Sequence, residues 1–304
     1  MGERRAAVKF VELSTLNPLV LIAGPTGSGK SALAVHLAQR FHGEVVNCDS
    51  VQVFRGFDIG AAKLTPDERG GVPHHLIDIA DPTDIFTAGD FARLGRAVLR
   101  EITSRKELQI LAGGTGFYIR ALLEGLFEGP GRDEGIRRRL SSSEAGRPGS
   151  LHRILTRLDR VAAARIHRND VKKTIRALEV ILTANQRLSE IQAACKSDAL
   201  EGYRILRLGL DPPRAELYAR IDARVERMFG GGLLEEVKSL VEQGWPPAAK
   251  PFESLAYTKA LRHLGGLITR DEAIAEAKMM TRRYAKRQWT WFRRDPEIQW
   301  FAGF

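Results

Sequence analysis

The amino-acid sequence predicts an α/β fold, in which a parallel β-sheet is flanked by helices and a helical insertion interrupts the sheet domain. In the first 125 residues, short apolar segments alternate with helical patterns, which is typical of parallel sheets covered on both faces. A long stretch in the middle of the chain then shows helical spacing and no strand pattern. With 304 residues, the chain is long enough for one large domain and a smaller one.

The expected elements follow one another in a regular order. Strands are expected at 19–23, 44–48, 75–79 and 108–112, and helices at 30–41, 87–104 and 116–124. Farther along, a strand is expected at 203–210 and helices at 214–229, 231–243 and 271–294. Parallel sheets bind ligands beyond the carboxyl ends of their strands, so the loops that follow the strands are the first candidates for a site.

The composition divides the chain into three parts. Residues 128–150 are rich in Gly, Ser, Pro and Arg, and helical spacing follows until about residue 195. We therefore predict an N-terminal tail at 1–17, a core domain formed by 18–127 and 201–304, and a helical insertion domain at 128–200.

The loop after the first strand is a phosphate-binding loop (P-loop), which predicts a sheet like that of the P-loop NTPases. Glycines let backbone N–H groups wrap around an anion, while a helix N-terminus and Lys30 add positive charge. The Ser31 hydroxyl is a candidate ligand of magnesium. The loop residues, between an apolar strand and a helix, are Gly24, Pro25, Thr26, Gly27, Ser28, Gly29, Lys30 and Ser31.

The acid that a hydrolase would carry is missing from the expected place. An ATPase would show an apolar strand ending in Asp or Asp-Glu, which holds magnesium and the attacking water. Here the strand 108–112 runs into Gly113-Gly114-Thr115-Gly116. The loop is therefore expected to hold a diphosphate or triphosphate for a reaction other than hydrolysis.

Polar residues follow two other expected strands. Asp49 comes after 44–48, where a carboxylate could accept a proton from a nucleophile or hold magnesium, or only bond its own loop. Thr115 lies between glycines, where its hydroxyl could donate to a leaving oxygen or cap the next helix. Ser50 and Gln52 could contact a polar substrate or simply be polar loop residues.

The charge of the chain favours an anionic partner. The formal net charge is +10, and nucleic acid is the first candidate partner for such a balance. Along helix 214–229, Arg220, Arg224 and Arg227 line up where one of them could reach a phosphate. A cluster in the insertion comprises Arg153, Arg157, Arg160, Arg165, Arg168, Lys172, Lys173 and Arg176.

A second cluster, at 282–294, mixes cations with aromatic residues. Cations contact phosphates, while aromatic rings pack in the core or stack on unpaired bases, so this cluster predicts nucleic-acid contact.

Cysteine usage and hydropathy narrow the class of protein. Cys48 and Cys195 lie far apart and form no C-x-x-C pair, which excludes a disulfide framework and a zinc module and fits a reducing compartment. No apolar stretch is long enough to span a membrane, and 1–17 lacks the apolar region of a secretory signal. We expect a cytoplasmic monomer with no membrane partner.

Together these motifs resemble the bacterial tRNA dimethylallyltransferases, also called tRNA isopentenyltransferases. The resemblance extends from about Pro18 to Phe301, with the motifs in order and at the family's spacing. The matching segments are GPTGSGKSALA (24–34), DSVQVFRGFDIGAAK (49–63), HHLIDIADP (74–82), AGGTGFYIRALLEGL (112–126), VAAARIHRND (161–170), RALEV (176–180), LYARIDARVERM (217–228) and YAKRQWTWFR (284–293).

The resemblance implies transfer of a dimethylallyl group from dimethylallyl diphosphate to the exocyclic amine of an adenosine. That adenosine lies immediately 3′ of the anticodon in tRNAs that read codons beginning with U. Lys30, Ser31 and Arg220 would hold the diphosphate with Mg²⁺. Thr115 would donate to the bridging oxygen, and Asp49 would accept the proton of the attacking amine. By resemblance, the tRNA-binding residues are Asp49, Ser50, Val51, Gln52, Lys172, Lys173, Arg176, Arg282, Arg283, Lys286 and Arg287.

The chain departs from the family pattern at Lys172-Lys173 and at Ala256-Tyr257-Thr258-Lys259, both in regions that the resemblance implies contact tRNA. Three alternatives remain: a free-nucleotide (adenylate) isopentenyltransferase, a P-loop small-molecule kinase that turns over ATP, and a non-catalytic RNA-binding protein. The insertion and the basic clusters argue against the first, since a free nucleotide needs neither. The second does not explain the insertion. Intact Lys30, Asp49 and Thr115 argue against the third.

Overall fold

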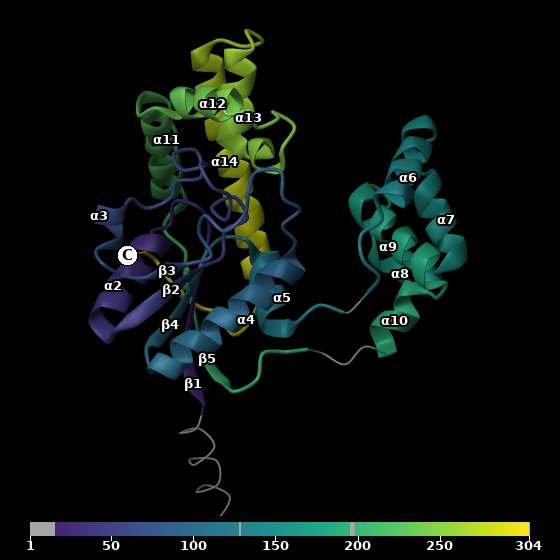
Figure 1. Ribbon diagram of the computed structural model, residues 1–304, viewed down its shortest axis with the longest axis horizontal. Helices are drawn as coiled ribbons and strands as arrows, with labels where there is room; N and C mark the ends of the chain where they lie inside the picture. The colour runs from purple at the N-terminus through teal and green to yellow at the C-terminus, as the bar shows by residue number, and fades with distance from the viewer. Residues whose placement is uncertain (1–15, 128, 195–197, 304) are drawn as a thin grey trace, which may run out of the picture. The chain divides into compact units, whose positions relative to one another are not determined.

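The computed structural model describes residues 16–127, 129–194 and 198–303, so most of the tail predicted at 1–17 lies outside the described residues, as does Cys195. The described chain divides into two compact units (Figure 1). The first is formed by the chain up to Leu123 and again from Leu200 onward, and the second is Glu124–Ala199. The divisions predicted from the sequence are at 127/128 and 200/201.

The first unit is built around a six-stranded sheet with the strand order β3–β2–β4–β1–β5–β6. Every strand pair is parallel, which confirms the predicted α/β fold. The strands are β1 (Asn17–Ala23), β2 (Gly43–Asn47), β3 (His74–His75), β4 (Leu108–Ala112), β5 (Tyr203–Leu210) and β6 (Gln299–Phe301).

Two strands differ from the sequence prediction. The strand expected at 75–79 ends at His75, because Leu76 and Asp78 adopt left-handed φ angles of 60° and 57°, which no strand accommodates. Strand β6 was not predicted, since three residues are too few to show an alternating pattern.

The helices of the first unit bury apolar faces against this sheet and against one another. Helix α2 packs Ala34 and Ala38 against Val20, Ile22 and Ile110 of the sheet. The bounds are α2 (Lys30–Phe41), α3 (Pro66–Arg69), α4 (Ala88–Arg105), α5 (Gly116–Glu124), α11 (Arg214–Gly230), α12 (Leu233–Glu242), η1 (Lys250–Glu253), α13 (Leu255–Leu264) and α14 (Arg270–Phe292).

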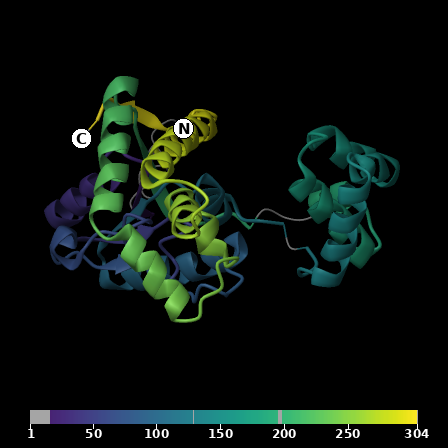
Figure 2. The same ribbon diagram turned by 90° about the horizontal axis from the view of Figure 1, so that it is seen from above.

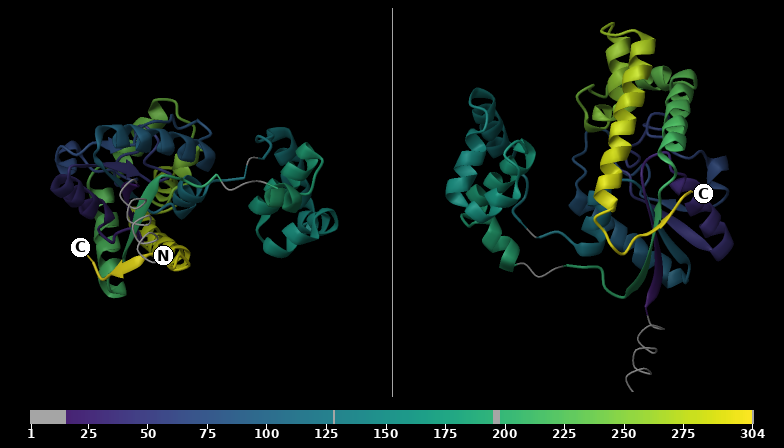
Figure 3. Two further views of the ribbon diagram at one scale, coloured as in Figure 1. Left: turned by 90° about the horizontal axis from the view of Figure 1, so that it is seen from below. Right: turned by 180° about the vertical axis from the view of Figure 1, so that it is seen from behind.

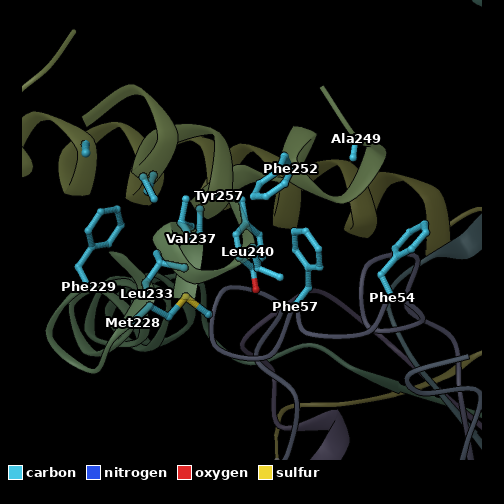
Figure 4. Close-up of a cluster of buried hydrophobic side chains, with 14 of the residues drawn as sticks. Phe54, Phe57, Met228, Phe229, Leu233, Val237, Leu240, Ala249, Phe252 and Tyr257 are labelled. Atoms are coloured by element: carbon cyan, nitrogen blue, oxygen red, sulfur yellow. The ribbon is translucent and has the colours of Figure 1, made fainter. Parts of the chain in front are cut away.

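Helices α11 to α14 form a layer that packs onto the loop after β2. Figure 4 shows Phe54 and Phe57 of that loop among side chains of α11, α12 and α13. Figure 2 shows α11 and α14 side by side, and Figure 3 shows the length of α14 running toward α12 and α13. The fully buried Tyr257 donates its hydroxyl to Glu236 and accepts from the Gly60 N–H at 3.1 Å.

Helix α13 corrects one implication of the family resemblance. Its residues Ala256, Tyr257 and Lys259 are buried, and the Lys259 ammonium forms an ion pair with Glu276 at 2.6 Å. These side chains therefore lie in the core and not on a surface that could contact tRNA. The helix was not predicted because the proline-rich segment 244–251 before it obscures its start.

The second unit is helical, with its own apolar core of residues such as Leu151, Leu155 and Leu178. Helix α6 was not predicted, since none of its residues is buried and no apolar period marks it. The helices are α6 (Glu134–Gly146), α7 (Ser150–Leu158), α8 (Arg160–Arg165), α9 (Val171–Ala184) and α10 (Leu188–Ala194). In the parts of the chain that the structure describes, no helix combines the length and hydropathy needed to cross a bilayer.

Candidate functional site

The register of the sheet brings three loops to the same level. Ile22 of β1 and Asn47 of β2 both pair with Ala112 of β4. The loops that follow these strands therefore start side by side at the carboxyl edge, where parallel sheets bind ligands. The first is the P-loop, the second carries Asp49, and the third carries Thr115.

The P-loop has the backbone of an anion cradle. Gly27 and Gly29 adopt φ angles of 83° and 97°, which a side chain would strain. Helix α2 begins immediately afterwards at Lys30, so its free N–H groups and positive dipole end face the loop. The Ser28 hydroxyl is buried and has no hydrogen-bond partner among the described residues. An unpaired buried hydroxyl at this place is well suited to bind an oxygen of a ligand.

In the described part of the chain, no carboxylate forms an ion pair with the Lys30 ammonium. Its ammonium donates a hydrogen bond of 2.7 Å to the Pro25 carbonyl. Burial, assisted by the nearby Arg224 guanidinium, lowers the pKa of Lys30 to about 7, while the charge of Asp49 opposes that shift. An anion bound in the loop would supply the missing charge and raise the pKa again.

Arg224, and not Arg220, reaches the P-loop from α11. The Arg224 guanidinium donates to the Thr26 hydroxyl, and its Nε is buried without a partner in the described chain. Arg220 lies one turn away, is 45% exposed and faces Glu216 at 3.8 Å. The spacing of Arg220 and Arg224 predicts that both lie on one face of the helix. The family resemblance implies that Arg220 holds the diphosphate. The structure shows Arg224 in contact with the loop, whereas the ionic contact of Arg220 is with Glu216.

Asp49 is fixed by its own loop. Its Oδ1 accepts hydrogen bonds from the N–H groups of Val51 at 2.8 Å and Gln52 at 3.3 Å. Its charge contributes to the pKa shifts of Lys30 and Arg224, which places the carboxylate near both cations. Asp49 therefore forms hydrogen bonds within its own loop, which was one of the alternatives for its role. The same bonds orient its carboxylate, which lies near the two cations of the P-loop.

The amide nitrogen of Gln52 forms hydrogen bonds within its own loop. Its Nε2 donates to the carbonyls of Ala61 at 3.0 Å and Ala62 at 3.2 Å. Both amide hydrogens are thereby used, and only the acceptor Oε1 is left for a substrate.

Thr115 is tied to the loop of Asp49. Its N–H donates to the Cys48 carbonyl at 3.1 Å, and its hydroxyl oxygen accepts from the Ser50 N–H at 3.1 Å. A side chain at Gly113 would come within 2.3 Å of the Cys48 carbonyl oxygen, so only glycine allows this approach. The structure thus brings Thr115, Ser50 and Asp49 together.

The outer face of α14 forms a basic hollow of about 400 Å³. Arg283, Lys286 and Arg287 are exposed there, and the Trp291 ring is 39% exposed. The hollow is lined by Arg283, Lys286, Arg287, Thr290, Trp291 and Arg294. Arg282 takes a different role, because its guanidinium pairs with Asp222 of α11 at 2.8 Å and joins the two helices.

Of the predicted tRNA-binding residues in the second unit, two are exposed and one forms contacts within the unit. Lys172 and Lys173 are exposed on α9, with Lys173 paired to Asp170 at 2.7 Å. Arg176 instead donates to the buried Glu179 at 2.7 Å and to the Pro130 carbonyl at 2.8 Å. Its contacts are those of a residue that stabilises the fold of its own unit.

The described residues contain no group of three or more His, Cys, Asp or Glu side chains that could hold a metal ion. Ser31 is exposed in the first turn of α2, next to the cradle. Its hydroxyl oxygen is a ligand of the kind that magnesium accepts.

A family model and individual relatives among known proteins match most of this chain. Residues 52–295 match the protein family described as IPP transferase. The tRNA dimethylallyltransferase of Solibacter usitatus is 58% identical over 287 residues, which cover 94% of this chain and 93% of the relative. A relative of the same name from Koribacter versatilis is 52% identical, with the same two shares of 94% and 93%.

Two solved structures are similar as well. The full-length tRNA isopentenylpyrophosphate transferase of Bacillus halodurans is 40% identical with a TM-score of 0.69, over 94% of this chain and 89% of that one. A eukaryotic dimethylallyltransferase acting on tRNA is 28% identical with a TM-score of 0.78, over 91% of this chain and 70% of that one.

The low pKa of Lys30 predicts a pH-dependent stability. Below pH 7 the folded and unfolded chains both carry the charge, and the folded chain bears the full cost of burying it. Between the folded pKa of about 7 and the usual value of 10.5, the folded chain releases the proton and that cost falls. From pH 7 to pH 9, wild-type protein should gain about 2 kcal/mol relative to Lys30→Met.

Urea unfolding at pH 6, 7, 8 and 9 without ligand measures this difference. Lys238→Met, which removes an exposed lysine from α12, is the matched control and should differ from wild type by a constant amount. A constant difference for Lys30→Met as well would show that the buried charge is not Lys30.

Proposed function

The chain belongs to the IPP transferase family, and we infer that it is an enzyme that transfers a dimethylallyl group to tRNA. We propose dimethylallyl diphosphate as the donor. The proposed acceptor is the exocyclic amine of the adenosine immediately 3′ of the anticodon, in tRNAs that read codons beginning with U. The observation that carries the proposal is the P-loop, which shares its edge of the sheet with a carboxylate and a hydroxyl, Asp49 and Thr115.

The P-loop would hold the diphosphate of the donor. Backbone N–H groups, the unpaired Ser28 hydroxyl and Lys30 surround the place of the anion. Arg224 would be the second cation, because its guanidinium already contacts Thr26 of the loop. As the carbon–oxygen bond breaks, the leaving diphosphate gains negative charge, and Thr115 would donate to its bridging oxygen. One such donor is typically worth about 3 kcal/mol in the transition state.

The acceptor side would be formed by the loop after β2. An adenine amine is a weak nucleophile because its lone pair is delocalised, so a base must remove its proton as the new bond forms. The Asp49 carboxylate, oriented by the Val51 and Gln52 N–H groups, would accept that proton. The Ser50 hydroxyl and the free Gln52 oxygen would hold the edge of the adenine. The adenosine must first leave its stack, which costs a few kcal/mol.

Magnesium fits the cradle through Ser31. A bound Mg²⁺ would neutralise charge on the diphosphate. The chain's own contribution would be the Ser31 hydroxyl, at the first turn of α2.

Two basic surfaces would bind the tRNA. The hollow on α14 would contact phosphates through Arg283, Lys286 and Arg287, with Trp291 available for stacking. Lys172 and Lys173 would add phosphate contacts from the second unit. Arg176 and Arg282 would support these surfaces through their ion pairs. We propose that the protein acts as a cytoplasmic monomer.

A transfer assay tests the function directly. The protein is mixed with labelled dimethylallyl diphosphate, Mg²⁺ and either an anticodon stem-loop with a run of adenosines after the anticodon or AMP. We expect label on the stem-loop and none on AMP. Asp49→Asn should keep the loop bonds but lower the turnover of the stem-loop by about 100-fold, as expected for loss of a general base.

Asp67→Asn, an exposed change in α3, is the matched control and should keep normal turnover. Label on AMP would indicate the nucleotide enzyme, and consumption of ATP without any label would indicate a kinase. Normal turnover of Asp49→Asn would remove Asp49 from its proposed role.

The two arginines of α11 can be separated by one pair of variants. Arg224→Gln should raise the KM for dimethylallyl diphosphate and lower kcat, with a combined loss of about 100-fold or more. Arg220→Gln, an equal change one turn away, should cost less than about 3-fold. Steady-state kinetics with saturating stem-loop measures both. The opposite order of effects would return the role to Arg220.

The hollow on α14 predicts a salt-dependent affinity for tRNA. Lys286→Glu should weaken binding and reduce the slope of log K against log salt by about 1, because one phosphate contact is lost. Lys238→Glu makes the same charge change on the exposed face of α12 and should leave the slope unchanged. Fluorescence anisotropy from 50 to 300 mM salt measures the slopes. Equal slopes for Lys286→Glu and wild type would place the tRNA elsewhere.

A further inference from the structure

One buried amide on α14 joins two of the three loops. The Gln288 side chain is 6% exposed. Its Oε1 accepts the N–H of Thr26 in the P-loop at 2.7 Å, and its Nε2 donates to the Gly114 carbonyl at 2.8 Å. Gly114 directly precedes Thr115. A single planar group thus connects the cradle to the turn that carries the proposed leaving-group donor.

The turn is shaped to let α14 come this close. A Cβ at Gly114 would lie 2.1 Å from Nε2 of Gln288, and a Cβ at Gly116 would lie 2.1 Å from the indole nitrogen of Trp291. Real Cβ atoms do not approach other atoms so closely, so a side chain at either position would displace Gln288 or Trp291 from its place. The contact of Gln288 is therefore part of the construction of the loop.

Other side chains also contact Thr26 of the P-loop and Thr115 of the turn after β4. The Thr26 hydroxyl accepts from Arg224 of α11, so Thr26 is held through its N–H by one helix and through its side chain by another. The Tyr284 hydroxyl, one turn before Gln288, interacts with Thr115 and Gln288. Burial and the charge of Asp49 raise the pKa of Tyr284 to about 12, so this hydroxyl keeps its proton at neutral pH.

We propose that Gln288 is a positioning residue that sets the distance between the phosphate cradle and the Thr115 hydroxyl. This inference rests on the proposed function. Donors stabilise a leaving group only if they are already aimed at the place where charge develops, and an error of about 1 Å is costly. Because the carboxamide bonds both loops, neither can shift relative to the other without breaking a buried hydrogen bond.

A purely structural role would give a different pattern of kinetics. If Gln288 acts through Thr115, its removal should matter only while the Thr115 hydroxyl is present. Gln288→Met keeps the volume of the side chain and removes both hydrogen bonds. We expect it to lower kcat about 10- to 100-fold with the tRNA Kd unchanged. In a Thr115→Val background, the same change should lower kcat less than about 3-fold, since residues that act as a unit are not additive.

Hydrogen exchange of the Thr26 amide provides a readout that does not depend on turnover. The amide should exchange at least 10-fold faster in Gln288→Met than in wild type. Gln288→Glu keeps the acceptor for Thr26 and should leave this amide protected, but it loses the donor to Gly114 and should still lower kcat. Gln243→Met, at the exposed end of α12, is the control and should change neither quantity.

The outcomes separate the two proposals. A wild-type protein that transfers no dimethylallyl group would overturn the proposed function. In an active enzyme, unchanged Thr26 exchange in Gln288→Met would overturn the inference about Gln288. Costs of Gln288→Met and Thr115→Val that multiply in the double variant would overturn it as well.

Discussion

The site depends on the parallel pairing of β1, β4 and β2. Because Ile22 and Asn47 both pair with Ala112, the chain leaves all three strands at the same level. A shift of one residue in either pair would reverse which face each following side chain meets. It would also separate Thr115 from the Cys48 carbonyl, which its N–H contacts at 3.1 Å. The register of the sheet therefore sets where the cradle, the carboxylate and the hydroxyl start relative to one another.

Helices from the far end of the chain complete what the sheet begins. Arg224 of α11 and Gln288 of α14 both contact Thr26, although more than 190 residues separate them from it. The two helices are joined by the Arg282–Asp222 ion pair and pack onto the loop after β2 through the core around Phe57 and Tyr257. The core of the unit and its site are thus built from the same helices.

Sequence reasoning was most successful where function is local. The P-loop, Asp49 and Thr115 each follow a strand whose apolar run is visible in the sequence. Arg224 could not be separated from Arg220, because residues four apart share a helix face and only packing decides which one is buried. Gln288 was not predicted as a site residue, since the cations and aromatics around it pointed to nucleic-acid contact and gave no reason to single out one amide. The family resemblance placed Ala256 and Tyr257 in a region that contacts tRNA, and the helix that buries them was not predicted. The roles of the site residues remain predictions.

The two cations at the P-loop, Lys30 and Arg224, would favour the transition state of the proposed transfer. Lys30 is held where its charge is costly, as its pKa of about 7 indicates, and Arg224 has a buried Nε without a partner in the described chain. A diphosphate ester would relieve part of this cost when it binds. The free diphosphate that would form as the carbon–oxygen bond breaks carries more charge at the same place and would relieve more of it. Interactions that strengthen in this way accelerate the chemical step, whereas equal attraction to donor and product would only tighten binding. The electrostatic cost of placing Lys30 and Arg224 together at the P-loop is therefore consistent with group transfer from a diphosphate.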